Sequence, residues 1–117
     1  MYKKGGTYPM NYYNPYYQDR INEQQEFSRQ GRTFYFDLKR SGKFDALLSL
    51  PGVVNSWSKV FVSICEISIV GGQVKPILGD ATMHVYNVVP QDDGTIQVRG
   101  FVDFGEPLNV RLSVLVM

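Results

Sequence analysis

The sequence predicts an all-β fold, namely a single antiparallel β-sandwich of jelly-roll-like form over residues 32–117, preceded by an extended arm over residues 1–31. Three observations lead to this prediction. Apolar residues alternate with polar ones along the second part of the chain, Gly, Pro and Asp clusters interrupt the alternation at roughly regular spacing, and helical periodicity is almost absent. Short strands joined by tight turns are typical of sandwiches and barrels, with about six to eight strands in a body of this length.

Composition supports one soluble-type domain and excludes several classes of protein. The chain has 117 residues, 44% of them hydrophobic, and a net charge of +1. Its single cysteine, Cys65, excludes an internal disulfide framework and a zinc site of paired thiolates. No apolar run approaches the roughly 20 residues of a membrane-spanning helix, and the N-terminus lacks the apolar stretch of a signal peptide. We therefore expect no membrane partner and synthesis in the cytoplasm, with the final location left open between a virion and a released or surface fibre.

The first strand of the body is expected over 33–39, where Phe34, Phe36 and Leu38 alternate with polar residues. Ser41-Gly42 then marks a turn. The next segment, Phe44 to Leu50, is ambiguous, because Asp45 can cap one helical turn through Leu48 before Pro51-Gly52 ends the element.

The segment 59–70 is the strongest strand, because it is rich in β-branched residues. Both faces of its first half are apolar, so we expect that half to be covered on two sides. The residues concerned are Val60, Phe61, Val62 and Ile64. Gly71-Gly72 predicts a tight hairpin turn into a strand over 73–77.

Three more strands are expected over 81–89, 96–103 and 108–116, with Asp92-Asp93-Gly94 as the turn between the first two. The alternation also predicts which side chains form the core. They are Phe34, Phe36, Leu38, Val62, Ile64, Ile67, Val85, Val98, Val102, Val110, Leu112 and Val114.

The sequence contains no constellation typical of an enzyme, so we expect no catalytic activity, no cofactor and no metal. The one histidine, His84, has no nucleophile or orienting group in its sequence context, and Cys65 is expected to be a small buried hydrophobe within a strand. Asp92 and Asp93 are read as turn residues, because the segment lacks the alternating ligands and the closing Glu of a calcium loop.

An alternative interpretation is a small β-barrel module that binds single-stranded nucleic acid or a glycan through exposed aromatic rings. The candidate residues are Tyr35, Trp57, Tyr86 and Phe101, with Arg99 and Arg111 facing outward. Residues 33–117 hold seven basic and eight acidic residues, a net charge of −1, which argues against nucleic acid. Acidic and amide groups beside the rings would instead favour a sugar.

The N-terminal segment differs from the body in composition. Six of the eight tyrosines fall within the first 17 residues, a stretch that has no Val, Leu or Ile and contains Pro9 and Pro15. Such a segment cannot form a core of its own. Tyrosine offers a large contact area at low entropic cost and is enriched at protein interfaces.

These observations predict a non-enzymatic structural subunit that self-assembles with copies of itself, and with any other subunits of the same assembly, into a particle or fibre. The arm would link neighbours by adding to an open sheet edge or by packing through its side chains. In outline the chain is similar to small jelly-roll virion proteins, such as pentons and cement proteins, and to β-sandwich subunits of bacterial surface or spore fibres. The predicted subunit interface comprises Tyr8, Tyr12, Tyr13, Tyr16, Tyr17, Tyr35, Trp57 and Phe101.

Overall fold

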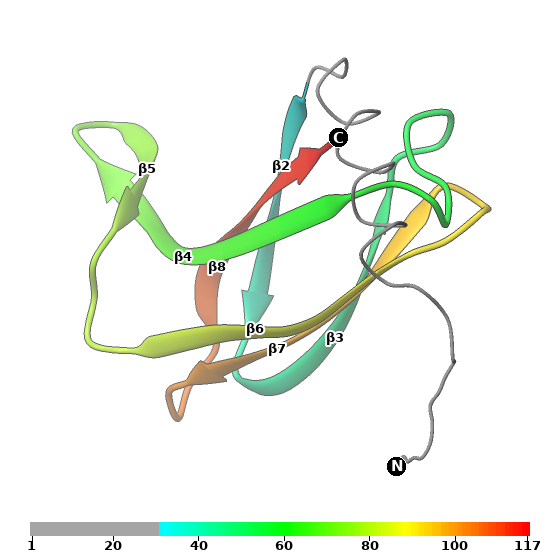
Figure 1. Cartoon of the computed structure of the whole chain (residues 1–117). Coiled ribbons are helices and arrows are strands. Elements are labelled where there is room, and N and C mark those ends of the chain that lie inside the picture. The colour runs from blue at the N-terminus through cyan, green and yellow to red at the C-terminus, as the bar shows by residue number, and fades with distance from the viewer. Residues whose placement is uncertain (1–30) are drawn as a thin grey trace, which may run out of the picture. The chain divides into compact units, whose positions relative to one another are not determined.

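Two antiparallel sheets pack face to face in the computed structural model, which describes residues 31–117 (Figure 1). The four-stranded sheet has the order β2-β8-β4-β5, and the three-stranded sheet has the order β3-β7-β6. The strands are β2 (Arg32–Arg40), β3 (Gly42–Ser49), β4 (Val60–Val70), β5 (Gln73–Ile77), β6 (Thr82–Pro90), β7 (Thr95–Asp103) and β8 (Leu108–Val116). The predicted all-β sandwich is confirmed. The predicted arm, with all its tyrosines, lies outside the described residues except for Gly31.

The strand pairing is nested, which gives the sandwich its jelly-roll-like form. The first described strand, β2, pairs with the last, β8, and the second, β3, pairs with the penultimate strand, β7. The chain crosses from one sheet to the other between β2 and β3, where Gly42 has a φ of 69°. A long antiparallel hairpin that folds across two layers produces this arrangement.

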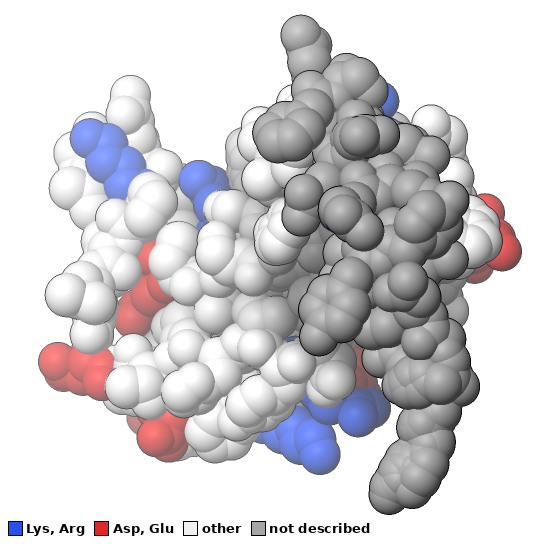
Figure 2. All heavy atoms as spheres, viewed as in Figure 1, with Lys and Arg blue, Asp and Glu red and all other residues white. Residues whose placement is uncertain are grey.

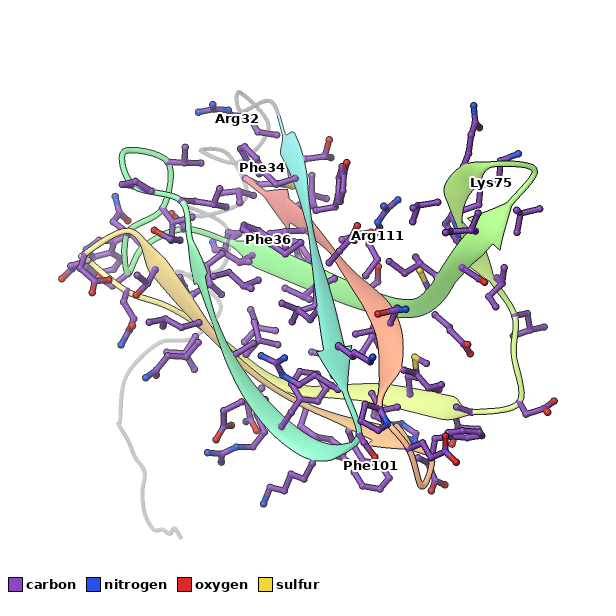
Figure 3. All side chains as sticks on the ribbon, turned by 180° about the vertical axis from the view of Figure 1, so that it is seen from behind. Arg32, Phe34, Phe36, Lys75, Phe101 and Arg111 are labelled. Carbon is purple, nitrogen blue, oxygen red and sulfur yellow. The ribbon has the colours of Figure 1, made fainter. Side chains whose placement is uncertain are left out.

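The core lies between the two sheets and matches the predicted alternation. Of the predicted residues, Val98, Val102, Val110, Leu112 and Val114 are buried in this core. Ile67 is also buried, but it lies outside the core cluster. The other six are partly buried against the core: Phe34, Phe36, Leu38, Val62, Ile64 and Val85. Figure 3 shows Phe34 and Phe36 on the core side of β2 and Arg111 on the opposite side of the sheet. The core also holds Phe44, Ala46, Leu48, Val54, Ile96 and Val116, which the prediction omitted.

The ambiguous segment is the strand β3, not a capped helical turn. It pairs with β7 along its whole length, from Gly42 opposite Val102 to Ser49 opposite Thr95. Phe44, Ala46 and Leu48 point into the core, while the intervening residues are exposed. This burial of every second side chain, together with a full ladder of backbone hydrogen bonds, outweighs a single local cap at Asp45.

The expectation that β4 is covered on both sides is wrong for the part of the chain that the structure describes. Val62 and Ile64 contact the core, but Phe61 on the other face is 59% exposed. Only the inner face of the four-stranded sheet packs on the second sheet. The apolar residue on the outer face of β4 therefore forms part of an open surface.

The connection between β3 and β4 is held against the turn between β6 and β7. Gly94 has a φ of 87°, and a Cβ placed on it would lie 2.7 Å from Pro51 Cα, so the position requires glycine. The Leu50 amide donates to the Gly94 carbonyl at 2.8 Å, and the Ser56 hydroxyl and amide both donate to Asp92 Oδ1. The predicted turn at Asp92-Asp93-Gly94 thus also anchors a distant loop.

Candidate functional site

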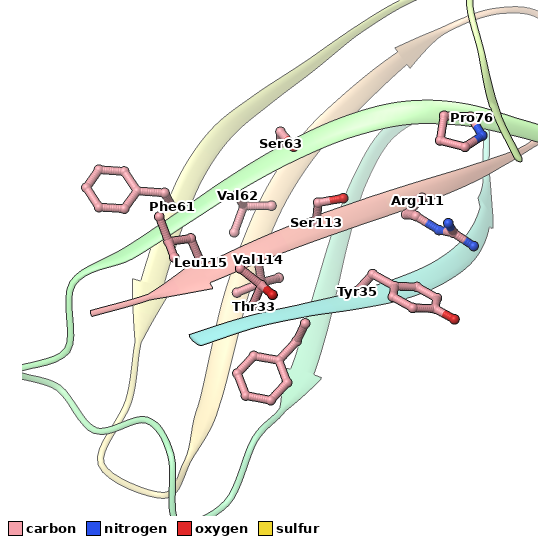
Figure 4. Close-up of a pocket in the computed structure, with 11 residues that line it drawn as sticks. Thr33, Tyr35, Phe61, Val62, Ser63, Pro76, Arg111, Ser113, Val114 and Leu115 are labelled. Carbon is pink, nitrogen blue, oxygen red and sulfur yellow. The ribbon is translucent and has the colours of Figure 1, made fainter. Parts of the chain in front are cut away.

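The outer face of the four-stranded sheet carries an open groove of about 520 Å³, here called the outer groove (Figure 4). Three rows of paired residues lie along it, each running from β2 through β8 to β4. They are Thr33–Leu115–Phe61, Tyr35–Ser113–Ser63 and Asp37–Arg111–Cys65, of which the third contributes only Arg111 to the lining. Pro76 of β5 adds to the lining. Because side chains opposite one another share a face of the sheet, these three rows present their side chains together.

One end of the outer groove is organised by Arg111. Its Nε and Nη2 atoms donate to the two carboxylate oxygens of Asp37 at 2.7 and 2.9 Å. The guanidinium also lies 4.1 Å from the centre of the Tyr35 ring. The hydrogen bond from Arg111 holds the pKa of Asp37 below its usual value, and the same bond raises the pKa of Arg111. The pair is neutral as a unit, so this end of the groove presents no net charge.

The outer face of the three-stranded sheet carries a second hollow of about 510 Å³. It is lined by Asp45, Leu47, Asn87, Val89, Gln97 and Arg99, together with the buried Ala46 and Val98. Arg99 Nε donates to Asp45 Oδ1 at 2.8 Å, which lowers the pKa of the Asp45 carboxyl and raises that of Arg99. This second hollow therefore combines two amides and one ion pair with apolar walls.

An irregularity in β6 exposes Tyr86 next to Asn87, which lines the second hollow. The register with β7 shifts between Val85 and Asn87, so Tyr86 and Asn87 are both exposed. The rings of Tyr86 and His84 are parallel within 4°, with centroids 5.9 Å apart. Phe101 is the partner of His84 across the strands.

The predicted interface residues of the body do not form one surface. Tyr35 is 62% exposed on the four-stranded sheet, Phe101 is half-buried on the three-stranded sheet, and Trp57 is 87% exposed in the loop before β4. The five predicted arm tyrosines lie outside the described residues. Tyr86 and Phe101 do share a face with Arg99, whereas Tyr35 shares its face with Arg111.

The residues considered for catalysis or metal binding either lie on different sheets or already accept hydrogen bonds within the body. Cys65 lies opposite Arg111 on the outer face of the four-stranded sheet, where it is half-buried and not the buried side chain that was predicted. His84 is exposed on the outer face of the other sheet. Asp93 accepts hydrogen bonds from the hydroxyl and amide of Thr95, which lower its pKa, as Ser56 lowers that of Asp92. Among residues 31–117, no three His, Cys, Asp or Glu residues are placed to hold a metal ion.

Sequence reasoning missed the exposed apolar residues of the β4–β5 hairpin. Ile69, Val70, Val74 and Leu78 are all exposed, and so is Phe61 at the other end of β4. The segment 59–70 does carry apolar residues on both faces, but this pattern predicted that both faces are covered. An apolar face that the body leaves open gives the same pattern.

No family model, curated protein or solved structure matches the chain. Within residues 31–117, no helix has the length and apolarity needed to cross a membrane.

Proposed function

We propose that this protein is a non-enzymatic structural subunit that self-assembles into a particle or fibre, with its N-terminal arm linking neighbouring copies. The observation that carries the proposal is the amount of apolar surface on the body. Among residues 31–117, eleven large hydrophobic side chains are exposed: Tyr35, Leu47, Trp57, Phe61, Ile69, Val70, Val74, Leu78, Tyr86, Val89 and Phe104. Scattered exposed apolar residues are ordinary, but exposed apolar faces on both sheets and on a hairpin are typical of interaction surfaces.

The sheet edges offer a second route for association. Within the described residues, β2, β3, β5 and β6 each pair with a single strand, so each leaves one edge unpaired. An extended segment of another chain can add to such an edge through backbone hydrogen bonds. A head-to-tail exchange of arms builds rings, shells or filaments, depending on whether rotation closes it.

The charge distribution agrees better with protein association than with nucleic-acid binding. Residues 31–117 hold eight basic and eight acidic residues. Figure 2 shows both signs scattered over the visible face without a patch of one sign. The two arginines nearest the exposed rings, Arg99 and Arg111, are both paired with aspartates. A groove that follows a phosphate backbone normally needs an excess of unpaired positive charge.

Deletion of residues 2–20 tests this function. The full-length chain should form large assemblies that electron microscopy can image. The deleted chain should keep a β-dominated circular dichroism spectrum, because residues 31–117 supply all seven described strands and the core cluster between them, but it should form no assemblies. Assemblies of unchanged form from the deleted chain would contradict the role of the arm and place association in the sheet faces.

One observation favours a second function, the binding of a neutral sugar on the three-stranded sheet. Asp45, Asn87, Gln97 and Arg99 line a hollow beside the parallel rings of His84 and Tyr86. Planar amide and carboxylate groups suit the paired hydroxyls of a pyranose, and a ring can pack on its C–H face. Amide chemical shifts of β6 and β7 should move when neutral oligosaccharides are titrated, and Asn87→Ala should abolish the response. Unchanged shifts at saturating sugar would remove this candidate.

A further inference from the structure

We infer that the outer groove is the receptor for the tyrosine segment of the arm, residues 8–17, supplied by a second copy of the chain. This inference rests on the proposed function, since it names the surface that the arm would occupy. It is an interaction surface formed by β2, β8, β4 and β5, with a segment of the same protein as its partner (Figure 4).

The lining of the outer groove matches the chemistry of that segment. Two exposed aromatic side chains, Phe61 and Tyr35, stand on either side of the exposed hydroxyls of Ser63 and Ser113. Rings pack on rings, and hydroxyls of serine can exchange hydrogen bonds with hydroxyls of tyrosine. The groove therefore provides both of the contacts that a tyrosine side chain can make.

The outer groove and the segment 8–17 also match in charge. The only ionised groups in the three rows across the outer groove are Asp37 and Arg111, and they form a bidentate pair. The segment 8–17, which reads YPMNYYNPYY, has no charged residue, whereas charges flank it at Lys3, Lys4, Asp19 and Arg20. A groove without net charge suits an uncharged aromatic segment better than an acidic or basic peptide, because no charge loses its hydration unpaired.

The length of chain outside the described residues is sufficient to reach a neighbour. Residues 18–30 connect the segment to Gly31 and span at most about 43 Å when extended, at about 3.3 Å per residue. A body of this length has a radius of gyration of about 12 Å, which corresponds to a diameter of about 30 Å. The connecting segment can therefore cross the contact between two bodies that touch.

The chain enters the body beside the outer groove. A Cβ on Gly31 would lie 2.8 Å from Leu115 Cδ1. Leu115 belongs to the row with Thr33 and Phe61, at the opposite end of the groove from Arg111. Self-assembly, the proposed function, requires that the docked arm comes from a second copy, and the mixing experiment distinguishes this from docking within one chain.

The test compares full-length variants that differ only in which face they change. Ser113→Arg places a long charged side chain in the middle of the outer groove, at an exposed position of β8. Ser49→Arg makes the same substitution at an exposed position of β3 in the other sheet, outside both hollows. We expect sedimentation velocity to show monomeric Ser113→Arg and a Ser49→Arg distribution equal to that of the unchanged chain. Phe61→Ser, on the outward side of β4, replaces Ser113→Arg if circular dichroism shows that variant to be unfolded.

A mixing experiment then identifies the occupant. A chain in which Tyr12, Tyr13, Tyr16 and Tyr17 are all replaced by serine keeps its groove, and Ser113→Arg keeps its arm. Mixed in equal amounts, the two should form a species of twice the monomer mass and nothing larger, since each pair has one arm and one groove in use. Equal assembly by Ser113→Arg and the unchanged chain would overturn the groove as receptor, while loss on deleting residues 2–20 would still uphold the proposed function. A monomeric unchanged chain would overturn both.

Discussion

Single residues in this sandwich are constrained mainly by what faces them across the core. Gly100 on β7 lies under the ring of Phe44, and a Cβ added there would come within 2.6 Å of Phe44 Cζ and 2.8 Å of the His84 carbonyl. The turn at Asp92-Asp93-Gly94 was predictable from residue type alone. Its attachment to Ser56, 36 residues earlier, was not, because that contact depends on the tertiary arrangement.

We expect Gly100→Ala to destabilise the body by about 1–3 kcal/mol, because overpacking forces neighbouring side chains out of their preferred rotamers. Gly105→Ala is the matched control, since nothing lies within 4 Å of its added Cβ and its φ is not positive. Urea unfolding followed by circular dichroism measures both variants. Equal unfolding midpoints for the two would show that the close packing of Phe44 on β7 is not present in solution.

The ion pair between Asp37 and Arg111 predicts a pH dependence of stability. The pKa of Asp37 is lowered in the folded state, so its contribution is complete above the unfolded value of about 3.9 and is lost as pH falls through the lower folded value. Asp37 is 38% exposed, so the contribution should remain below about 1 kcal/mol. The urea midpoint of Asp37→Asn should therefore fall less than that of the unchanged chain between pH 7 and pH 2.5. The control Asp103→Asn, at an exposed position of β7, should behave like the unchanged chain.

Individual strands could be predicted to within one or two residues wherever alternation was clean, as in β7 and β8. The prediction was ambiguous at β3, because Leu47 and Leu48 are adjacent and apolar and Asp45 resembles a cap. It was wrong about the outer face of β4, because a single strand does not reveal whether a second layer covers it. Tertiary pairing decides both cases, and pairing depends on residues far away in the sequence.

Because β3 is a strand, replacing its two neighbouring leucines should lower the free energy of unfolding by very different amounts. Leu48 is buried at 2% exposure and Leu47 is 63% exposed, as the alternation of a strand requires. Leu48→Ala should cost about 2–5 kcal/mol of unfolding free energy, and Leu47→Ala less than about 0.5 kcal/mol. Chemical denaturation distinguishes the two outcomes. Similar losses for both variants would instead indicate that the segment buries both side chains.

For the whole molecule, the fold class followed from periodicity and turns, whereas the grouping of surface residues did not. Tyr35 and Phe101 are both outward-facing residues, yet they lie on opposite sheets because β2 pairs with β8 and β7 pairs with β3. The outer groove also requires that topology, since its three rows join strands from both ends of the body. Of the two surfaces that the proposal joins, only the uncharged, tyrosine-rich segment 8–17 could be identified from sequence.

Head-to-tail joining of copies, in which each arm docks on the next body, is tested most directly by a truncated chain that ends the assembly. A chain without residues 2–20 keeps its receptor surface but offers no arm, so it can end an assembly without extending it. When this truncated chain is titrated into the full-length chain, sedimentation velocity should show the mean mass of the assemblies falling steadily as its molar fraction rises. Full-length assemblies that keep their mass beside a separate population of truncated monomer would contradict arm exchange between copies.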